Sequence, residues 1–95
     1  MKLKMGLKIM VLRWPLTNKE KAWRTIKEMD SEWVTSRELA VLAGISVAQM
    51  TNFLKTAKRM GILEYKKGYI YHWTGFKINV GLWRKIRDFE IDEVL

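Results

Sequence analysis

One helix-start signal occurs three times in the first half of the chain. Residues 17–20 (TNKE), 35–38 (TSRE) and 46–49 (SVAQ) each place Thr or Ser three positions before Glu or Gln. This is the spacing of a capping box, in which the two side chains satisfy backbone N–H groups at the first turn of a helix. Apolar residues at helical spacing follow each tetrad. The sequence therefore predicts three helices, over residues 17–30, 35–43 and 46–60.

The connection between the second and third predicted helices is short and contains glycine. Gly44 has no Cβ and readily adopts the left-handed conformation that ends a helix. Ile45 follows it, and we expect its side chain to fill the corner between the two helices. Gly61 is placed to end the third helix in the same way.

Strand-prone residues follow the third helix. Two such runs, residues 62–66 and 69–73, flank a Lys-Gly pair at 67–68, which is typical of a β-hairpin with a tight turn. Residues 33–34 are expected to add a short third strand. Beyond Gly75 the pattern is weaker, and we expect an additional C-terminal helix. Asn79 would cap it, and its apolar face would carry Leu82, Trp83, Ile86 and Phe89.

The order of the predicted elements is helix, short strand, helix, turn, helix and hairpin. Residues 34–73 (VTSRELAVLAGISVAQMTNFLKTAKRMGILEYKKGYIYHW) carry most of this order. The segment resembles the winged helix-turn-helix superfamily of DNA-binding proteins, and residues 34–63 follow its pattern without a gap. The resemblance implies an α+β fold with a three-helix core and a C-terminal hairpin, the wing. It is broadly similar to the multiple-antibiotic-resistance and metal-responsive repressors and does not select between them.

A chain of 95 residues is expected to form a single domain. We divide it into a basic N-terminal segment (1–15), a winged-helix core (16–73) and a C-terminal segment (74–95). Within 1–15, apolar residues from Leu3 to Val11 alternate with lysines or glycine, which favours a strand. This segment would extend the wing sheet or form a dimer strand, or else lie along DNA as a flexible arm.

The chain is strongly basic. Lys and Arg number 18 against 10 Asp and Glu, which gives a formal net charge of +8. A charge of this size predicts attraction to polyanions. Residues 1–14 carry four of the cations and no acid, whereas residues 88–93 carry four acids. We therefore expect the acidic end to face away from a bound nucleic acid.

The third predicted helix has an apolar side and a polar side. The apolar stripe, expected to face the core, consists of Val47, Met50, Leu54 and Ala57. The polar side is expected to enter the DNA major groove, which admits one α-helix. Asn and Gln pair with adenine and a methyl group meets thymine, whereas Lys and Arg bind guanine or phosphate. The candidates for base contact are Ala48, Gln49 and Asn52, and those for phosphate contact are Lys55, Lys58 and Arg59.

The predicted wing tip is a second candidate contact. Residues 66–68 form a compact positive point, and narrow minor grooves attract such cations. Tyr65, Tyr69 and Tyr71 would donate hydrogen bonds to phosphates or pack across the hairpin. The complete set of candidate DNA-binding residues is Ser46, Ala48, Gln49, Asn52, Lys55, Thr56, Lys58, Arg59, Lys66 and Lys67.

The residue types argue against catalysis and against a bound cofactor or metal. His72 is the only histidine, cysteine is absent, and the chain contains no glycine-rich phosphate loop. The acids at 88–93 are interpreted as an exposed tail. The apolar stretch at 7–12 is too short and too charged to span a membrane. We expect a soluble, cytoplasmic protein that is not an enzyme.

These features predict a sequence-specific transcriptional regulator that binds double-stranded DNA. Helix 46–60 would read the major groove, and the wing at 62–73 would contact the backbone or the minor groove. A homodimer would place two such helices about 10 base pairs apart, with the apolar face of the C-terminal helix and Trp23 as its interface. Two alternatives remain, a winged-helix module that binds protein and a replication-associated DNA-binding protein of a virus or plasmid.

Overall fold

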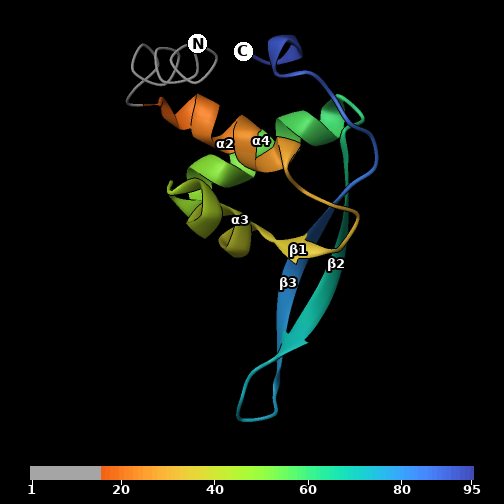
Figure 1. The fold of residues 1–95 in the computed structure, drawn as a ribbon. Helices are drawn as coiled ribbons and strands as arrows, with labels where there is room; N and C mark the ends of the chain where they lie inside the picture. Colours follow the sequence, from red (N-terminus) through yellow and green to blue (C-terminus); the bar gives the residue numbers. More distant parts are fainter. Residues whose placement is uncertain (1–15) are drawn as a thin grey trace, which may run out of the picture.

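Three helices begin at the three predicted capping positions. A computed structural model describes residues 16–95, and the expectations for residues 1–15 lie outside them. The helices are α2 (Asn18–Lys27), α3 (Ser36–Ala43) and α4 (Val47–Arg59) (Figure 1). Complete capping boxes start α2 and α3. At α4, Ser46 Oγ accepts from the Gln49 backbone N–H at 3.2 Å. Helix α2 ends three residues before the predicted Asp30.

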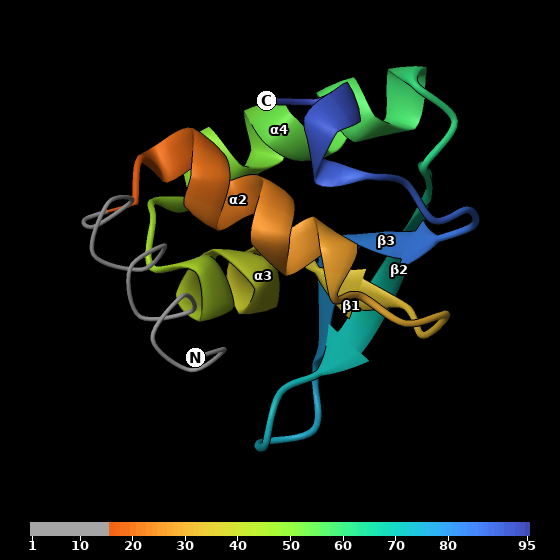
Figure 2. The same ribbon diagram turned by 45° about the horizontal axis from the view of Figure 1, so that its top comes forward.

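The tight turn between α3 and α4 is confirmed. Gly44 adopts the left-handed conformation, with φ 75° and ψ 34°, and its N–H donates to the carbonyl of Ala40 at 2.8 Å. Ile45 is partly buried against the core, as expected for a side chain that fills the corner. Gly61 ends α4 with φ 76°. The three helices pack against one another (Figure 2).

A three-stranded antiparallel sheet completes the fold. Its strands are β1 (Val34–Thr35), β2 (Leu63–Tyr71) and β3 (Lys77–Lys85), in the order β1-β3-β2. Three helices followed by a hairpin, with a small strand before α3, is the winged helix-turn-helix topology. The hairpin of β2 and β3 extends well beyond the helices (Figure 1). Nine-residue strands span about 30 Å, so the wing is long.

The predicted position of the hairpin turn is wrong. Gly68 lies within β2, paired with Val80, and the chain reverses at residues 72–76. There Gly75 takes φ 101°, and its N–H donates to the His72 carbonyl at 2.8 Å. Gly68 instead allows the side chain of Leu82 to pack closely against β2, because a Cβ at residue 68 would lie 2.6 Å from Leu82 Cδ1. It is therefore a packing glycine and not a turn glycine.

The predicted C-terminal helix is also wrong, because β3 occupies residues 77–85. Ile78 and Val80 are β-branched and alternate with other residue types, a pattern that favours a strand over a helix. A single 3-10 turn, Ile91–Glu93, follows. Of the predicted dimer face, Trp23, Trp83 and Phe89 are buried in the domain's own core, whereas Ile86 is 52% exposed.

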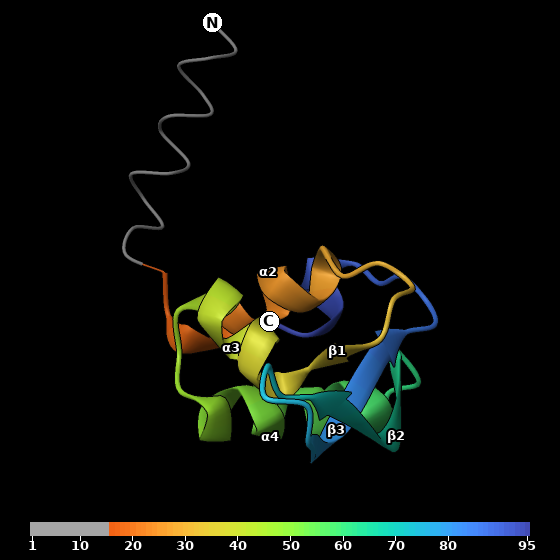
Figure 3. The same ribbon diagram turned by 90° about the horizontal axis from the view of Figure 1, so that it is seen from below.

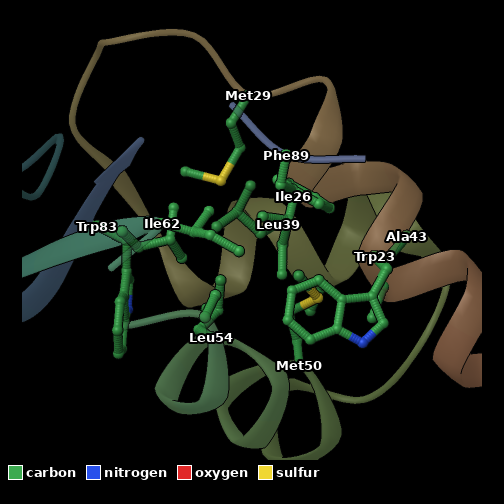
Figure 4. Close-up of a cluster of buried hydrophobic side chains, with 14 residues drawn as sticks. Trp23, Ile26, Met29, Leu39, Ala43, Met50, Leu54, Ile62, Trp83 and Phe89 are labelled. Carbon is green, nitrogen blue, oxygen red and sulfur yellow. The ribbon is translucent and has the colours of Figure 1, made fainter. Parts of the chain in front are cut away.

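The core lies where the three helices meet the base of the hairpin (Figure 4). Trp23 packs edge-on against both Phe53 and Phe89, with ring centroids 6.3 Å and 5.8 Å apart. From α4, the core receives the predicted Met50, Leu54 and Ala57, whereas the predicted Val47 is 43% exposed. The remaining buried apolar residues are Ala22, Ile26, Met29, Leu39, Ala40, Ala43, Ile62, Leu63 and Trp83.

Polar contacts tie the chain after β3 to the end of α2. Lys27 Nζ donates to Asp88 Oδ1 at 3.1 Å and also to the Phe89 carbonyl. Lys85 Nζ donates to the Lys27 carbonyl at 2.6 Å. The backbone N–H of Phe89 and the Lys27 ammonium lower the pKa of Asp88 below its ordinary value of 3.8. These contacts hold the buried Phe89 against α2.

Candidate nucleic-acid interface

The polar side of α4 is exposed to solvent. Thr56 is half-buried, and the other predicted residues on and before this helix are exposed: Ser46, Ala48, Gln49, Asn52, Lys55, Lys58 and Arg59. Figure 3 shows α4 beside the hairpin at the bottom of the view and α2 at the top. We distinguish two edges of the polar side of α4: one flank faces α2, and the other flank faces the wing.

On the flank toward α2, side chains of α4 are engaged within the protein. Gln49 Oε1 accepts from Asn18 Nδ2 and from Ser46 Oγ, each at 3.3 Å. Thr56 Oγ1 donates to the Asn52 carbonyl at 3.2 Å and accepts from Arg59 Nη2 at 3.1 Å. Gln49 is thus tied toward α2, and the Arg59 guanidinium is held along the helix.

On the flank toward the wing, α4 and the sheet enclose a groove of about 430 Å³. Two lysines of α4, Lys55 and Lys58, form its cationic wall. Trp83 stands on the opposite side, and its Nε1 donates to Ser36 Oγ at 3.0 Å. The complete lining is Ser36, Thr51, Lys55, Lys58, Tyr65, Gly81 and Trp83.

The groove continues along the hairpin. A second hollow of about 480 Å³ shares Tyr65 and Gly81 with the first and adds Lys67 and Asn79. Successive residues of a strand point to opposite faces, so alternate residues of the hairpin lie on the same side as α4. We call this the inner wing face. It consists of Tyr65, Lys67, Tyr69, Tyr71, Lys77, Asn79 and Gly81.

Aromatic rings and cations alternate on the inner wing face. Lys77 Nζ lies 4.5 Å from the centroid of the Tyr69 ring. The rings of Tyr69 and Tyr71 meet edge-on at 5.5 Å. Such surfaces suit nucleic acids, because cations bind phosphate and aromatic rings contribute stacking or hydroxyl donors.

The two lysines predicted to act together at the wing tip lie on opposite faces of the sheet. Lys67 belongs to the inner wing face, whereas Lys66 Nζ lies 4.3 Å from the centroid of the Trp33 ring on the outer face. Arg84 contacts the same ring at 4.6 Å and forms an ion pair with Glu64. Lys66 is thus part of a cation–aromatic cluster that points away from the groove.

Sequence reasoning missed several residues of this surface. Ser36 and Thr51 were not singled out, because the predicted fold did not place the wing beside the start of α3 and the wing-side flank of α4. Gly81 was missed because the residues after Asn79 were assigned to a helix. Lys77 was missed because the hairpin was expected to turn at residues 67–68 and to end at residue 73. The alternation of β-branched residues from Ile78 onward was the available signal for that strand.

Residues 16–95 contain no group of three or more potential metal ligands. None of the helices in this part of the chain is long and apolar enough to cross a membrane. His72 Nδ1 accepts from the Thr74 backbone N–H at 3.2 Å and lies 2.7 Å from Thr74 Oγ1. The histidine therefore organises the hairpin turn.

No family model matches the chain, and no curated protein or solved structure matches it either.

Proposed function

We propose that the chain binds double-stranded DNA, with α4 in the major groove and the inner wing face against the sugar-phosphate backbone. The observation that carries this proposal is the continuity of the cationic groove. It runs from Lys55 and Lys58 on α4, past Tyr65, to Lys67 on the hairpin. A surface that carries cations on a helix and on an adjacent hairpin follows the two strands of a duplex better than it fits a globular partner.

The dimensions of α4 support this arrangement. An α-helix with its side chains is about 10–12 Å in diameter, which matches the width of the major groove, about 12 Å. The thirteen residues of α4 make it about 20 Å long. The exposed Ala48 and Asn52 lie on the part of α4 that would meet base edges. Lys55 and Lys58, on the flank toward the wing, would reach phosphates. Gln49 has less freedom to read a base, because its Oε1 already accepts two hydrogen bonds.

We further propose that the protein acts as a sequence-specific transcriptional regulator and as a homodimer. The buried Trp83 and Phe89 cannot supply the dimer contact. Val41 and Leu42 of α3 are 75% and 76% exposed. Among the apolar side chains of the three helices, this pair is the best placed to contact another protein. The same pair supports the second candidate function, a winged-helix module whose partner is a protein.

Fluorescence anisotropy with a mixed-sequence duplex, repeated over a series of salt concentrations, tests the proposal. We expect affinity to fall steeply with salt, because phosphate contacts release counterions. Lys55→Glu and Lys58→Glu should each weaken binding. Replacing each lysine by a neutral residue should reduce the salt slope by about 1. Lys66→Glu is the matched control, because it makes the same charge change on the outer face.

Two results would contradict the proposal. One is the absence of binding at low salt. The other is an equal loss of affinity in Lys55→Glu and Lys66→Glu, which would show that net charge and not the groove attracts DNA. The first result would favour the protein-binding module, and Val41→Asp would then test the apolar pair on α3.

A further inference from the structure

The tip of the wing carries large apolar side chains that the domain does not cover. Trp73 is 89% exposed and Phe76 is 58% exposed. Both belong to the turn at residues 72–76, at the end of the hairpin farthest from the helices (Figure 1). Exposing an indole ring to water is unfavourable, and within residues 16–95 the ring of Trp73 contacts that of His72 in the same turn.

The turn holds these rings in a defined geometry. The His72 N–H donates to the Phe76 carbonyl at 2.8 Å, and the Gly75 N–H donates to the His72 carbonyl at 2.8 Å. The His72 and Phe76 rings stack with centroids 4.7 Å apart and planes 12° apart. Trp73 lies beside this stack, 5.4 Å from the His72 ring centroid. A preorganised aromatic tip loses little conformational entropy when it binds.

The length of the hairpin suits a DNA groove next to the one that α4 occupies. Tyr65 lies beside Lys55 and Lys58, and Trp73 follows eight residues later. The strand from Tyr65 to Tyr71 spans about 20 Å, and the turn that carries Trp73 lies beyond it. One turn of B-DNA is about 34 Å, so the centres of neighbouring major and minor grooves are about half of that apart. With α4 in the major groove, the tip therefore reaches the adjacent minor groove.

The charge of the hairpin favours a polyanion as the partner of this tip. Residues 65–83 contain Lys66, Lys67 and Lys77 and no acidic residue. Lys67 and Lys77 lie on the inner wing face, on the path between α4 and the tip. Some proteins that bind the minor groove insert an apolar side chain as a wedge between stacked base pairs, with cations nearby that contact the DNA. The hairpin has both features: cations along its inner wing face and an apolar ring at its tip.

We propose that Trp73 inserts between base pairs in the minor groove and kinks the duplex, with the His72–Phe76 stack supporting the indole from behind. This inference rests on the proposed DNA binding and adds a mechanical consequence to it. Pyrimidine–purine steps unstack most easily, so the wedge would enter at TA or CA steps. The site at which the protein binds would then depend on how easily the DNA bends there, as well as on the base contacts made by α4.

The test measures bending and binding separately on the full chain. A duplex with a donor and an acceptor dye at its ends, and one central TA step, reports bending by energy transfer. We expect the wild-type protein to increase the transfer and Trp73→Ala to abolish the increase. Because base–aromatic stacking is lost, Trp73→Ala should weaken binding by about 5- to 150-fold. The salt slope should not change, because no charge is removed. Trp73→Phe keeps an aromatic ring and should retain part of the bend.

The outcomes separate this inference from the proposed function. Binding with a steep salt slope and no bend would overturn the wedge and leave DNA binding intact. Failure of the wild-type protein to bind would overturn both. Trp73-dependent binding to phosphatidylserine vesicles, without any bending of DNA, would overturn the wedge in favour of a membrane surface. Trp73-dependent self-association, without any bending of DNA, would overturn it in favour of a second copy of the chain.

Discussion

The ring of Tyr65 lies directly on the backbone of Gly81. A Cβ at residue 81 would stand 2.6 Å from Tyr65 Cε1 and 2.7 Å from its hydroxyl oxygen. Gly81 therefore allows the tyrosine to lie flat between the two hollows of the cationic groove. We predict that Gly81→Ala pushes the ring out of the groove. DNA affinity should fall by about 2- to 10-fold, the effect of one hydrogen bond, as measured by anisotropy.

Gly68, on the other strand of the hairpin, provides a matched control. A Cβ at Gly68 would lie 2.6 Å from Leu82 Cδ1, on the outer face of the sheet. Gly68 borders the second hollow, but the Cβ added by Gly68→Ala would meet Leu82, which lines neither hollow. We expect Gly68→Ala to lower the melting temperature without weakening DNA binding. Equal losses of affinity in the two variants would show that hairpin stability, and not the position of Tyr65, controls binding.

The hydrogen bond between Trp83 and Ser36 joins the sheet to the first turn of α3. Removing it leaves a partly buried polar group without its partner, so Trp83→Phe and Ser36→Ala should each destabilise the fold. A double-mutant cycle measured by urea unfolding should give a coupling energy of about 0.5–1.5 kcal/mol. A coupling near zero would mean that the bond does not contribute to stability.

Asp88 should make stability depend on pH in the acid range. The Phe89 N–H and Lys27 favour its charged form, so its pKa in the folded protein lies below the ordinary value of 3.8. The resulting stabilisation is present above that ordinary value and is lost as the pH falls through the lower, folded value. Asp88→Asn should therefore melt at a slightly lower temperature than the wild type at pH 7, and the difference should vanish in strong acid.

Asp92→Asn is the control for this titration, because it removes the same charge from an exposed position four residues away. It should leave the melting temperature nearly unchanged at both pH values. A difference between Asp88→Asn and the wild type that persists in strong acid would contradict the role assigned to the carboxylate.

The helices could be predicted because their determinants are local. A Thr or Ser cap, its partner three residues later and a terminal glycine all act within one turn, so Thr35 and Gly44 have the same effect in most folds. The hairpin turn depends on tertiary context. Gly68 and Gly75 are both compatible with a turn. Gly75 reverses the chain with φ 101°, whereas Gly68 lies within β2, close to the side chain of Leu82.

The candidate site could be predicted only in part, for a similar reason. Helical periodicity correctly assigned Asn52 and Lys55 to the exposed side of α4, since one helix determines that side. Which flank meets the wing depends on the path of β3, which the sequence pattern had assigned to a helix. Lys66 and Lys67 lie on opposite faces because both belong to β2, where successive side chains point to opposite sides of the sheet. The sequence pattern predicts a turn at these residues, where no such alternation is expected.

The two amides of α4 provide a test of base reading. Asn52 is exposed on the side opposite the core, whereas the Oε1 of Gln49 accepts from Asn18 and Ser46. A bidentate contact to a base is worth about 1–3 kcal/mol of discrimination. We predict that Asn52→Ala reduces the preference for a duplex selected from a random pool over a mixed-sequence duplex by that amount. Gln49→Ala should reduce it less. A larger effect at Gln49 would mean that it leaves Asn18 on binding and reads the DNA in place of Asn52.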